Sequence, residues 1–151
     1  MRLVLATAAV LSTFSFQQAA LAATAECAPI TEEGVAKLFD SWNMAIATQN
    51  SENVAAKYAE NAILLPTLSN TPRLTHEQRV DYFNHFLEKQ PQGSIDSRVI
   101  RVGCNMATDS GTYTFAFADG AKVAARYTYA YEFIDGKWLI TGHHSSMMPE
   151  K

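Results

Sequence analysis

Apolar residues recur every three or four positions in two stretches of the chain, and this period is typical of amphipathic helices. The first stretch runs from Glu32 to about Thr48, and Thr31 is placed to cap its start. The second begins after Thr75, which opens a T-x-x-Q capping box, and it ends near Lys89. Between them we predict a short helix from Ser51, acting as N-cap, to about Tyr58.

Beyond Pro91 and Gly93 the apolar period changes from helical to alternating, which is typical of half-buried strands. Asp-Gly pairs at Asp119 and Asp135 predict tight turns, and strands joined by tight turns are antiparallel. The predicted strands, with one short strand before the last helix, are Ala62–Pro66, Ile95–Cys104, Gly111–Ala118, Val123–Phe133 and Trp138–Ser146. Helices followed by an antiparallel sheet indicate an α+β fold in which the helices pack on one face of a curved sheet.

The chain opens with a single charge, Arg2, followed by an apolar run from Leu3 to Phe16. This arrangement predicts a secretory signal peptide, and Ala20-Leu21-Ala22-Ala23 offers an A-x-A cleavage site. A membrane anchor is the alternative, but the run falls short of the roughly 20 residues that span a bilayer. We therefore expect residues 1–23 to be removed and residues 24–151 to form one exported domain, periplasmic or secreted, with no later membrane contact.

Charge and cysteine usage narrow the partners and the compartment. Removing Arg2 from the 12 basic residues leaves 11 against 15 acidic ones, a net charge of −4 with neutral histidines. No Lys/Arg cluster is present, so a nucleic-acid partner is not expected. The signal would send Cys27 and Cys104 to an oxidising compartment, and we predict a disulfide between them. Two unrelated thiols are the alternative.

The most specific sequence text lies near the end of the chain, in Ala125-Arg126-Tyr127-Thr128, Asp135-Gly136-Lys137-Trp138-Leu139-Ile140, His143-His144-Ser145-Ser146 and Pro149-Glu150. These segments, with Trp42-Asn43, Leu64-Leu65-Pro66 and Tyr82-Phe83, resemble the association (hub) domain of calcium/calmodulin-dependent protein kinase II, especially its stand-alone secreted bacterial members. That family belongs to the nuclear transport factor two-like, or SnoaL-like, superfamily. The resemblance implies a cone-shaped, cystatin-like fold, a homodimer or larger ring formed through the open sheet face, and a small-molecule pocket in the cone.

Arg126 is the first candidate for holding an anionic ligand in that pocket. Strand alternation places it opposite Tyr127 and Tyr129, and on a concave face it could bind a carboxylate in bidentate fashion. A structural ion pair with Glu132 or Asp96 is the alternative. The kinase hubs carry one ligand-binding arginine at the position that is Tyr129 here and another at the position of Ser145, so the resemblance does not reproduce the hub's arginine pocket.

His143 and His144 are the next candidates, because histidine moves protons near neutral pH. Neighbours on a strand point to opposite faces, so only one can face the pocket, and the resemblance matches His144 to the hub's final histidine. A packed histidine bonded to Ser146 or to a tyrosine is the alternative. Trp42 and Tyr82 are expected to border the cavity, since aromatic residues with a polar tip suit its rim.

Enzymes of this superfamily commonly place a carboxylate on the first strand, and this strand has none. Glu60 and Asp81 are expected to be solvated surface charges. No zinc spacing involves His76 or His85, and no cofactor motif is present, so neither a metal nor a cofactor is expected. The leading hypothesis is thus an exported, non-catalytic homo-oligomer that binds a small organic, possibly anionic, ligand. The alternatives are a SnoaL-like isomerase, lyase or oxidoreductase using His144 as base, and a purely structural hub.

Overall fold

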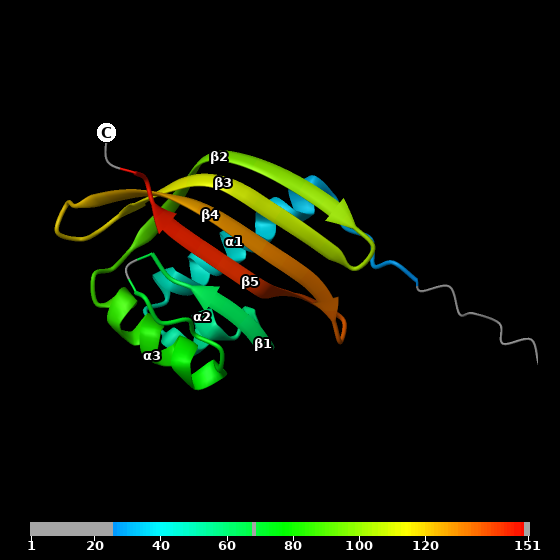
Figure 1. Cartoon of the computed structure of the whole chain (residues 1–151), viewed down its shortest axis with the longest axis horizontal. Helices are drawn as coiled ribbons and strands as arrows, with labels where there is room; N and C mark the ends of the chain where they lie inside the picture. Colours follow the sequence, from blue (N-terminus) through cyan, green and yellow to red (C-terminus); the bar gives the residue numbers. More distant parts are fainter. Residues whose placement is uncertain (1–25, 68, 150–151) are drawn as a thin grey trace, which may run out of the picture.

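Three helices cover one face of a five-stranded sheet in the computed structural model, which describes residues 26–67 and 69–149 (Figure 1). The elements are α1 (Glu32–Ala47), α2 (Ser51–Ala55), β1 (Tyr58–Leu65), α3 (His76–Leu87), β2 (Gln92–Gly103), β3 (Met106–Ala116), β4 (Lys122–Ile134) and β5 (Lys137–Met147). The strand order is β1-β5-β4-β3-β2, antiparallel except for the parallel pair of β1 and β5. The predicted α+β class is confirmed. The predicted signal peptide, residues 1–23, lies outside the described residues.

The helix starts follow from side-chain caps. Thr31 accepts a hydrogen bond from the first turn of α1, and Thr75 opens a complete capping box with Gln78 at the start of α3, as predicted. The predicted N-cap of α2 is wrong by one residue, because the side chain of Asn50, not Ser51, accepts from the free amides. This helix also stops at Ala55, since the chain then turns directly into β1.

All five strands are longer than the alternating pattern predicts, and β1 and β3 begin the most residues before their predicted starts. β1 begins at Tyr58 instead of Ala62. Its first half does not alternate between apolar and polar residues, because Glu60 and Asn61 are two exposed residues in a row, so the pattern does not predict it. β3 begins at Met106 instead of Gly111, because a tight turn with Asn105 at φ 56° joins it to β2. The antiparallel arrangement predicted for β2 to β5 is confirmed.

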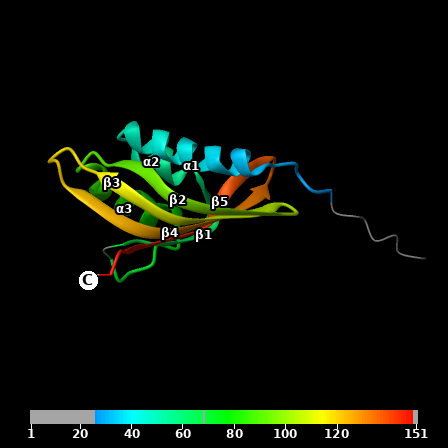
Figure 2. The same ribbon diagram turned by 90° about the horizontal axis from the view of Figure 1, so that it is seen from above.

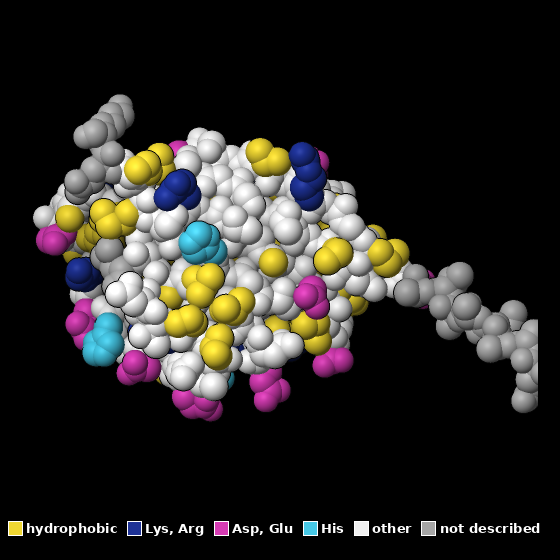
Figure 3. Space-filling model, viewed as in Figure 1, with side chains coloured by type: hydrophobic (Ala, Val, Ile, Leu, Met, Phe, Trp, Pro, Cys, Tyr) yellow, Lys and Arg dark blue, Asp and Glu magenta, His cyan; other side chains and the backbone are white. Residues whose placement is uncertain are grey.

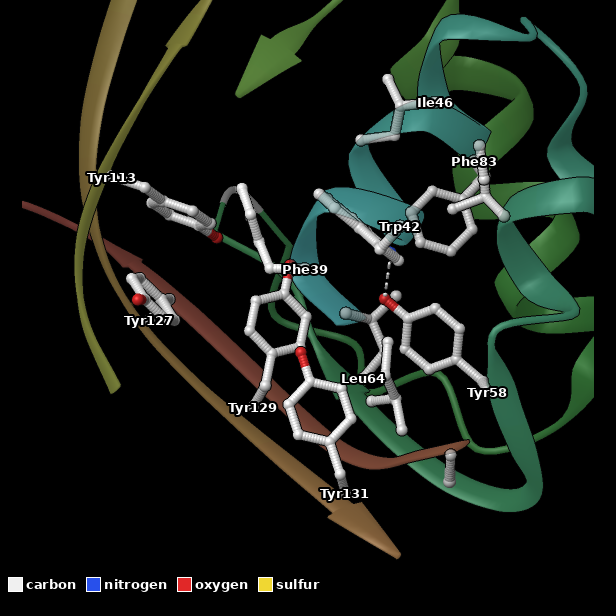
Figure 4. Packing of buried hydrophobic residues seen from close by; sticks show 14 of the residues in the cluster. Phe39, Trp42, Ile46, Tyr58, Leu64, Phe83, Tyr113, Tyr127, Tyr129 and Tyr131 are labelled. Atoms are coloured by element: carbon white, nitrogen blue, oxygen red, sulfur yellow. Dashed lines mark hydrogen bonds between the residues drawn. The ribbon is translucent and has the colours of Figure 1, made fainter. Parts of the chain in front are cut away.

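An aromatic core fills the space between α1 and the concave inner face of the sheet, with α1 on that side in Figures 1 and 2. Figure 4 shows Phe39 and Trp42 of α1 pointing toward tyrosines of β3 and β4. The alternate residues of β4 on the inner face, Ala125, Tyr127, Tyr129 and Tyr131, are all buried. This packing explains why the helices cover this face, since each aromatic side chain removes a large apolar area from water.

The predicted disulfide between Cys27 and Cys104 is confirmed. It joins the segment before α1 to the β2–β3 turn across 77 residues, and the amide of Ala28 donates to Oδ1 of Asn105 at 2.7 Å beside it. In the chain-entropy model, closing a loop of this length stabilises the fold by roughly 4 kcal/mol. The bond therefore anchors the segment that precedes the first helix.

None of the helices in the described part of the chain covers the outer face of the sheet, which faces the viewer in Figure 3. Arg126, Thr128 and Glu132 of β4 point outward and are exposed, as is His144 of β5. Apolar side chains gather near the middle of this face, and most of the acidic side chains lie at its edges (Figure 3). The two faces of the same strands thus have very different chemistry.

Candidate functional site

A cavity of about 510 Å³ opens between α3 and the end of the sheet where β5 finishes. Helices α1 and α3 contribute one wall, and the inner faces of β3, β4 and β5 contribute the other. Most of the wall is apolar, with Leu64, Phe83, Phe86, Phe115, Phe117 and Val123 among the lining residues. Apolar walls with a few polar groups are typical of small-molecule sites.

The polar groups of the cavity come together around Ser145 of β5. The hydroxyl of Tyr113, on β3, donates to Oγ of Ser145 at 2.6 Å. The hydroxyl of Thr67, which follows β1, also hydrogen-bonds to Ser145. All three residues line the cavity, so two strands and the loop after β1 supply one cluster of hydroxyl groups.

His143 lies beside this cluster and is only 5% exposed. Nε1 of Trp42 donates to the hydroxyl oxygen of Tyr58 at 3.1 Å, the contact drawn in Figure 4. That oxygen lies 2.8 Å from Nδ1 of His143, and because it already accepts from Trp42, its own proton is free to go to Nδ1. The neutral imidazole then carries its proton on Nε2, which is buried and has no partner among the described residues.

Burial keeps these groups uncharged. Desolvation, together with a smaller effect of the neighbouring His144, lowers the pKa of His143 to about 3. Desolvation also raises the pKa values of Tyr58 and Tyr113 above the ordinary value for tyrosine. At neutral pH the inner part of the cavity is therefore lined by a neutral imidazole and neutral hydroxyls.

The mouth of the cavity carries the charged groups. Arg73 is half-buried there, with its guanidinium 5.7 Å from the ring centre of Tyr82 and Nη2 donating to Oγ of Ser69 at 3.2 Å. Its backbone pairs with Leu64, which fixes the loop that follows β1. Asp81 and Glu88 also line the mouth but are exposed. Arg73 was not selected from the sequence.

The residues predicted for the pocket are divided between the two faces of the sheet. Trp42 and Tyr82 line the cavity. Tyr129 lies on the inner face but behind His143, with the two rings stacked at a centroid distance of 4.0 Å. Arg126 and His144 lie on the outer face and are exposed, so their predicted placement in the cone is wrong.

A β-bulge explains the histidine error. Ile140 of β5 points inward, and strict alternation from it would also turn His144 inward. The register shifts at Thr141, since Tyr131 pairs with Ile140 and the preceding Ala130 pairs with Gly142. The extra residue reverses the alternation, so His143 takes the inward position. His144 consequently has no access to the cavity as a base.

Arg126 also lacks the alternative role predicted for it. Its Nη2 donates weakly to the carbonyl of Met147 at 3.4 Å, and the described residues provide it with no ion pair to Glu132 or Asp96. Oδ2 of Asp96 instead accepts from the hydroxyl of Thr114 at 2.7 Å.

Across residues 26–67 and 69–149, no group of three or more His, Cys, Asp or Glu side chains could hold a metal ion. Within the same ranges, no helix is long and apolar enough to cross a membrane.

Comparisons with known proteins agree on the fold. A structure from Xanthomonas campestris, described as a calcium/calmodulin dependent protein kinase II association domain, is 48% identical over 88% of this chain and 95% of that chain, with a TM-score of 0.77. The iota-carbonic anhydrase from a cyanobacterium, complexed with bicarbonate, is 21% identical over 81% and 94% of the two chains (TM-score 0.72). An NTF2-like protein of unknown function from Pseudomonas putida is 13% identical over 79% and 87% (TM-score 0.70). The last two likenesses show the fold alone.

No protein with a curated description matches the sequence. The nuclear transport factor two-like, cystatin-like architecture expected from the sequence is confirmed by the solved structures. The family described as calcium/calmodulin dependent protein kinase II association domain matches residues 31–149, which is most of the chain. The chain therefore belongs to the calcium/calmodulin-dependent protein kinase II association-domain family.

Proposed function

We propose that the protein binds a small oxyanion at the inner end of its cavity, with bicarbonate as the first ligand to test. The observation that carries this proposal is the buried Nε2 of His143, which has no partner among the described residues and belongs to a ring that lines the cavity together with Ser145. A buried N–H without an acceptor costs about 1–3 kcal/mol. An oxyanion would accept from this N–H and from whichever hydroxyl of Ser145 and Thr67 does not donate to the other.

The charge distribution favours a monoanion. His143 is neutral, so the ligand would bring the single charge to the inner cavity and would meet donors rather than a second anion. Arg73 places a cation at the mouth, where it attracts an approaching anion. Asp81 and Glu88 are exposed at the rim, and solvent and salt screen their repulsion.

Matched pairs of variants test the binding site. We expect His143→Phe, which keeps a ring beside Tyr129 but removes the N–H, to weaken bicarbonate binding more than tenfold, because hydrogen bonds to charged groups contribute about 1.5–3 kcal/mol. Ser145→Ala should weaken it several-fold. The neighbouring His144→Phe and Ser146→Ala serve as controls and should bind like the wild type. Calorimetric titration with bicarbonate measures the four affinities, and equal losses in both pairs would contradict the proposal.

A second candidate function is the interconversion of CO₂ and bicarbonate. The similar structure of a carbonic anhydrase with bicarbonate supports it at the level of the fold. The cavity also suits an apolar reactant next to polar groups, because the aromatic wall of Phe83 and Phe115 lies beside His143 and Ser145.

In hydration, the oxygen of water would form a bond to the carbon of CO₂ while one C=O π bond breaks and leaves its electron pair on oxygen, and one proton of the water would leave. Nε2 of His143 could accept that proton only in the other tautomer, with Nδ1–H donating to Tyr58. A pKa of about 3 makes the imidazole a weak base, and the negative charge of the product would raise that pKa. Turnover therefore requires a change of tautomer, whereas binding does not.

Stopped-flow measurement of CO₂ hydration separates these two functions. An enzyme should show hydration above the buffer rate that His143→Phe removes and His144→Phe retains. Bicarbonate binding with no hydration would leave the binding function alone. The assay tests His143 as the base instead of His144, whose side chain lies on the outer face.

We also propose that the protein self-associates through the outer face of the sheet. The association-domain family supports self-association, and the outer face has no covering helix. Ala130→Arg places a long charged side chain on this face without altering the cavity. Light scattering after size exclusion should show a wild-type oligomer and a smaller Ala130→Arg species, and a wild-type monomer would contradict the proposal.

Export remains part of the proposal. The Cys27–Cys104 disulfide supports it, because such bonds persist in oxidising compartments. Amino-terminal sequencing of the mature protein from its native host should begin near Ala23 or Thr24. A mature chain that retains Met1 and stays inside the cell would contradict export.

A further inference from the structure

Arg79 is a fully buried charge on α3 that lies outside the cavity described above. Its side chain is 0% exposed, yet no carboxylate pairs with it among the described residues. Isolated buried charges are costly, and burial accordingly lowers the pKa of the Arg79 guanidinium. Its guanidinium must therefore be stabilised by other groups.

The guanidinium binds three backbone carbonyls of β1. Nη1 donates to the carbonyl of Ala62 at 2.8 Å, and Nη2 donates to the carbonyls of Ala59 and Glu60, both at 3.0 Å. These residues lie where the pairing of β1 with β5 changes register, between Tyr58 and Ile63. Arg79 thus supplies hydrogen bonds to the irregular segment that directly follows Tyr58.

The same guanidinium lies over the ring of Tyr58, with its central carbon 5.7 Å from the ring centre. The ring of His143 lies roughly parallel to that of Tyr58, with a centroid distance of 6.2 Å and an interplanar angle of 27°. Tyr58 therefore touches both the buried cation and the imidazole. A cation near a phenol ring draws electron density from the ring and makes its O–H a stronger donor.

We propose that Arg79 is a positioning residue: it holds Tyr58 so that the phenol donates to Nδ1 of His143, which leaves the imidazole proton on Nε2. The effect of Arg79 on ligand binding rests on the proposed function, because the tautomer decides whether His143 can donate to an oxyanion. The tautomer itself is a property of the unliganded protein and can be measured without any ligand.

The test compares Arg79→Met with a matched core variant, Val35→Ala. Val35 is also 0% exposed, but it lies on α1 and does not line the cavity, so its loss lowers stability without touching Tyr58. Nitrogen-15 NMR of histidine-labelled protein at neutral pH distinguishes the bare ring nitrogen from the protonated one. Chemical denaturation of each variant measures the accompanying loss of stability.

In the wild type and in Val35→Ala, we expect a bare Nδ1 and a protonated Nε2 at His143. In Arg79→Met we expect both tautomers to be populated and bicarbonate to bind about fivefold more weakly, the equivalent of about one neutral hydrogen bond. An Arg79→Met protein that is less stable but keeps the wild-type nitrogen pattern would overturn the proposal and leave Arg79 a purely structural residue.

A second variant covers the case in which Arg79→Met does not fold. Arg79→Lys keeps the charge but offers one ammonium group in place of a planar fork, so it cannot reproduce all three carbonyl contacts. We expect a smaller shift toward the mixed tautomer pattern, and an unchanged pattern in Arg79→Lys would then count against the proposal. If the wild type does not bind bicarbonate, the proposed function fails, but the nitrogen pattern still decides the role of Arg79.

Discussion

His143 and His144 are adjacent on β5 and lie on opposite faces of the sheet. His143 is buried among aromatic rings, with its pKa lowered to about 3, and its side chain is part of the cavity wall. His144 is exposed on the face that no helix covers. The same contrast separates Tyr127 from Arg126 along β4. Two residues of one type, one position apart, therefore differ in burial, packing and access to the cavity.

In this fold, the side chains that reach the cavity are those that strand alternation turns toward the inner face. A single bulge at Thr141 decides which histidine faces inward, while residue type decides only what that position can then do. Inner-face changes should consequently affect stability and the cavity, and outer-face changes should affect neither. Pairs of neighbouring variants test that rule.

The largest expected contrast is between Tyr129→Ala and Thr128→Ala. Tyr129 is 0% exposed and packs against Phe39, Trp42 and His143, so its truncation should destabilise the protein by about 3–5 kcal/mol. Thr128 points outward, and its change should stay within about 0.5 kcal/mol. Urea unfolding measures both values, and comparable losses would show that the outer face is also packed.

The next contrast is between Tyr127→Phe and Arg126→Ala. The hydroxyl of Tyr127 donates at 2.8 Å to Oδ1 of Asp109, a fully buried carboxylate that also pairs with Arg98 at 2.7 Å. Removing one donor from this carboxylate should cost about 1.5–3 kcal/mol. Arg126→Ala should cost less than about 0.5 kcal/mol, since its single backbone contact is long and exposed. Thermal unfolding of both variants at neutral pH checks the order.

The third contrast concerns acid. The native pKa of His143, about 3, lies below the ordinary value of 6.5, so between these pH values the unfolded chain binds a proton that the native protein does not. The free energy of unfolding should fall as pH decreases through this window, by at most about 1.4 kcal/mol per pH unit from this group. Replacing His143 with Phe should flatten that slope.

His144→Gln is the control for the acid experiment and should keep the wild-type slope. The pKa values of Glu33 and Glu77 are also lowered, each first by a backbone hydrogen bond, but both carboxyls stay in every variant and cancel in the comparison. Unfolding curves collected from pH 7 to pH 4 supply the slopes. An identical slope in His143→Phe would mean that the imidazole titrates normally in the native protein.

Much of this architecture was predictable because it depends on local signals. The capping box at Thr75 and the Asp-Gly turn at Asp135 each act within a few residues, and they placed a helix and a hairpin correctly. The disulfide between Cys27 and Cys104 followed from there being two cysteines in a chain predicted to be exported.

The candidate site was less predictable because its geometry is nonlocal. Trp42 and Tyr82 could be placed at the cavity because aromatic residues with a polar tip suit its rim. The family resemblance selects His144 instead of His143, and the bulge that decides between them leaves no mark in a short alternating sequence. Tyr58 was missed because it appeared to belong to a helix, and Arg79 because a buried arginine bonded to carbonyls looks like any surface charge in sequence.

One titration tests directly whether bicarbonate binds beside His143 and not beside His144. Bicarbonate is titrated into wild-type protein labelled with nitrogen-15 histidine, and the ring signals of His143 and His144 are followed at constant pH. We expect the Nε2–H signal of His143 to shift and saturate while His144 stays fixed. Saturable shifts at His144, with His143 unchanged, would place the ligand on the outer face and contradict the account.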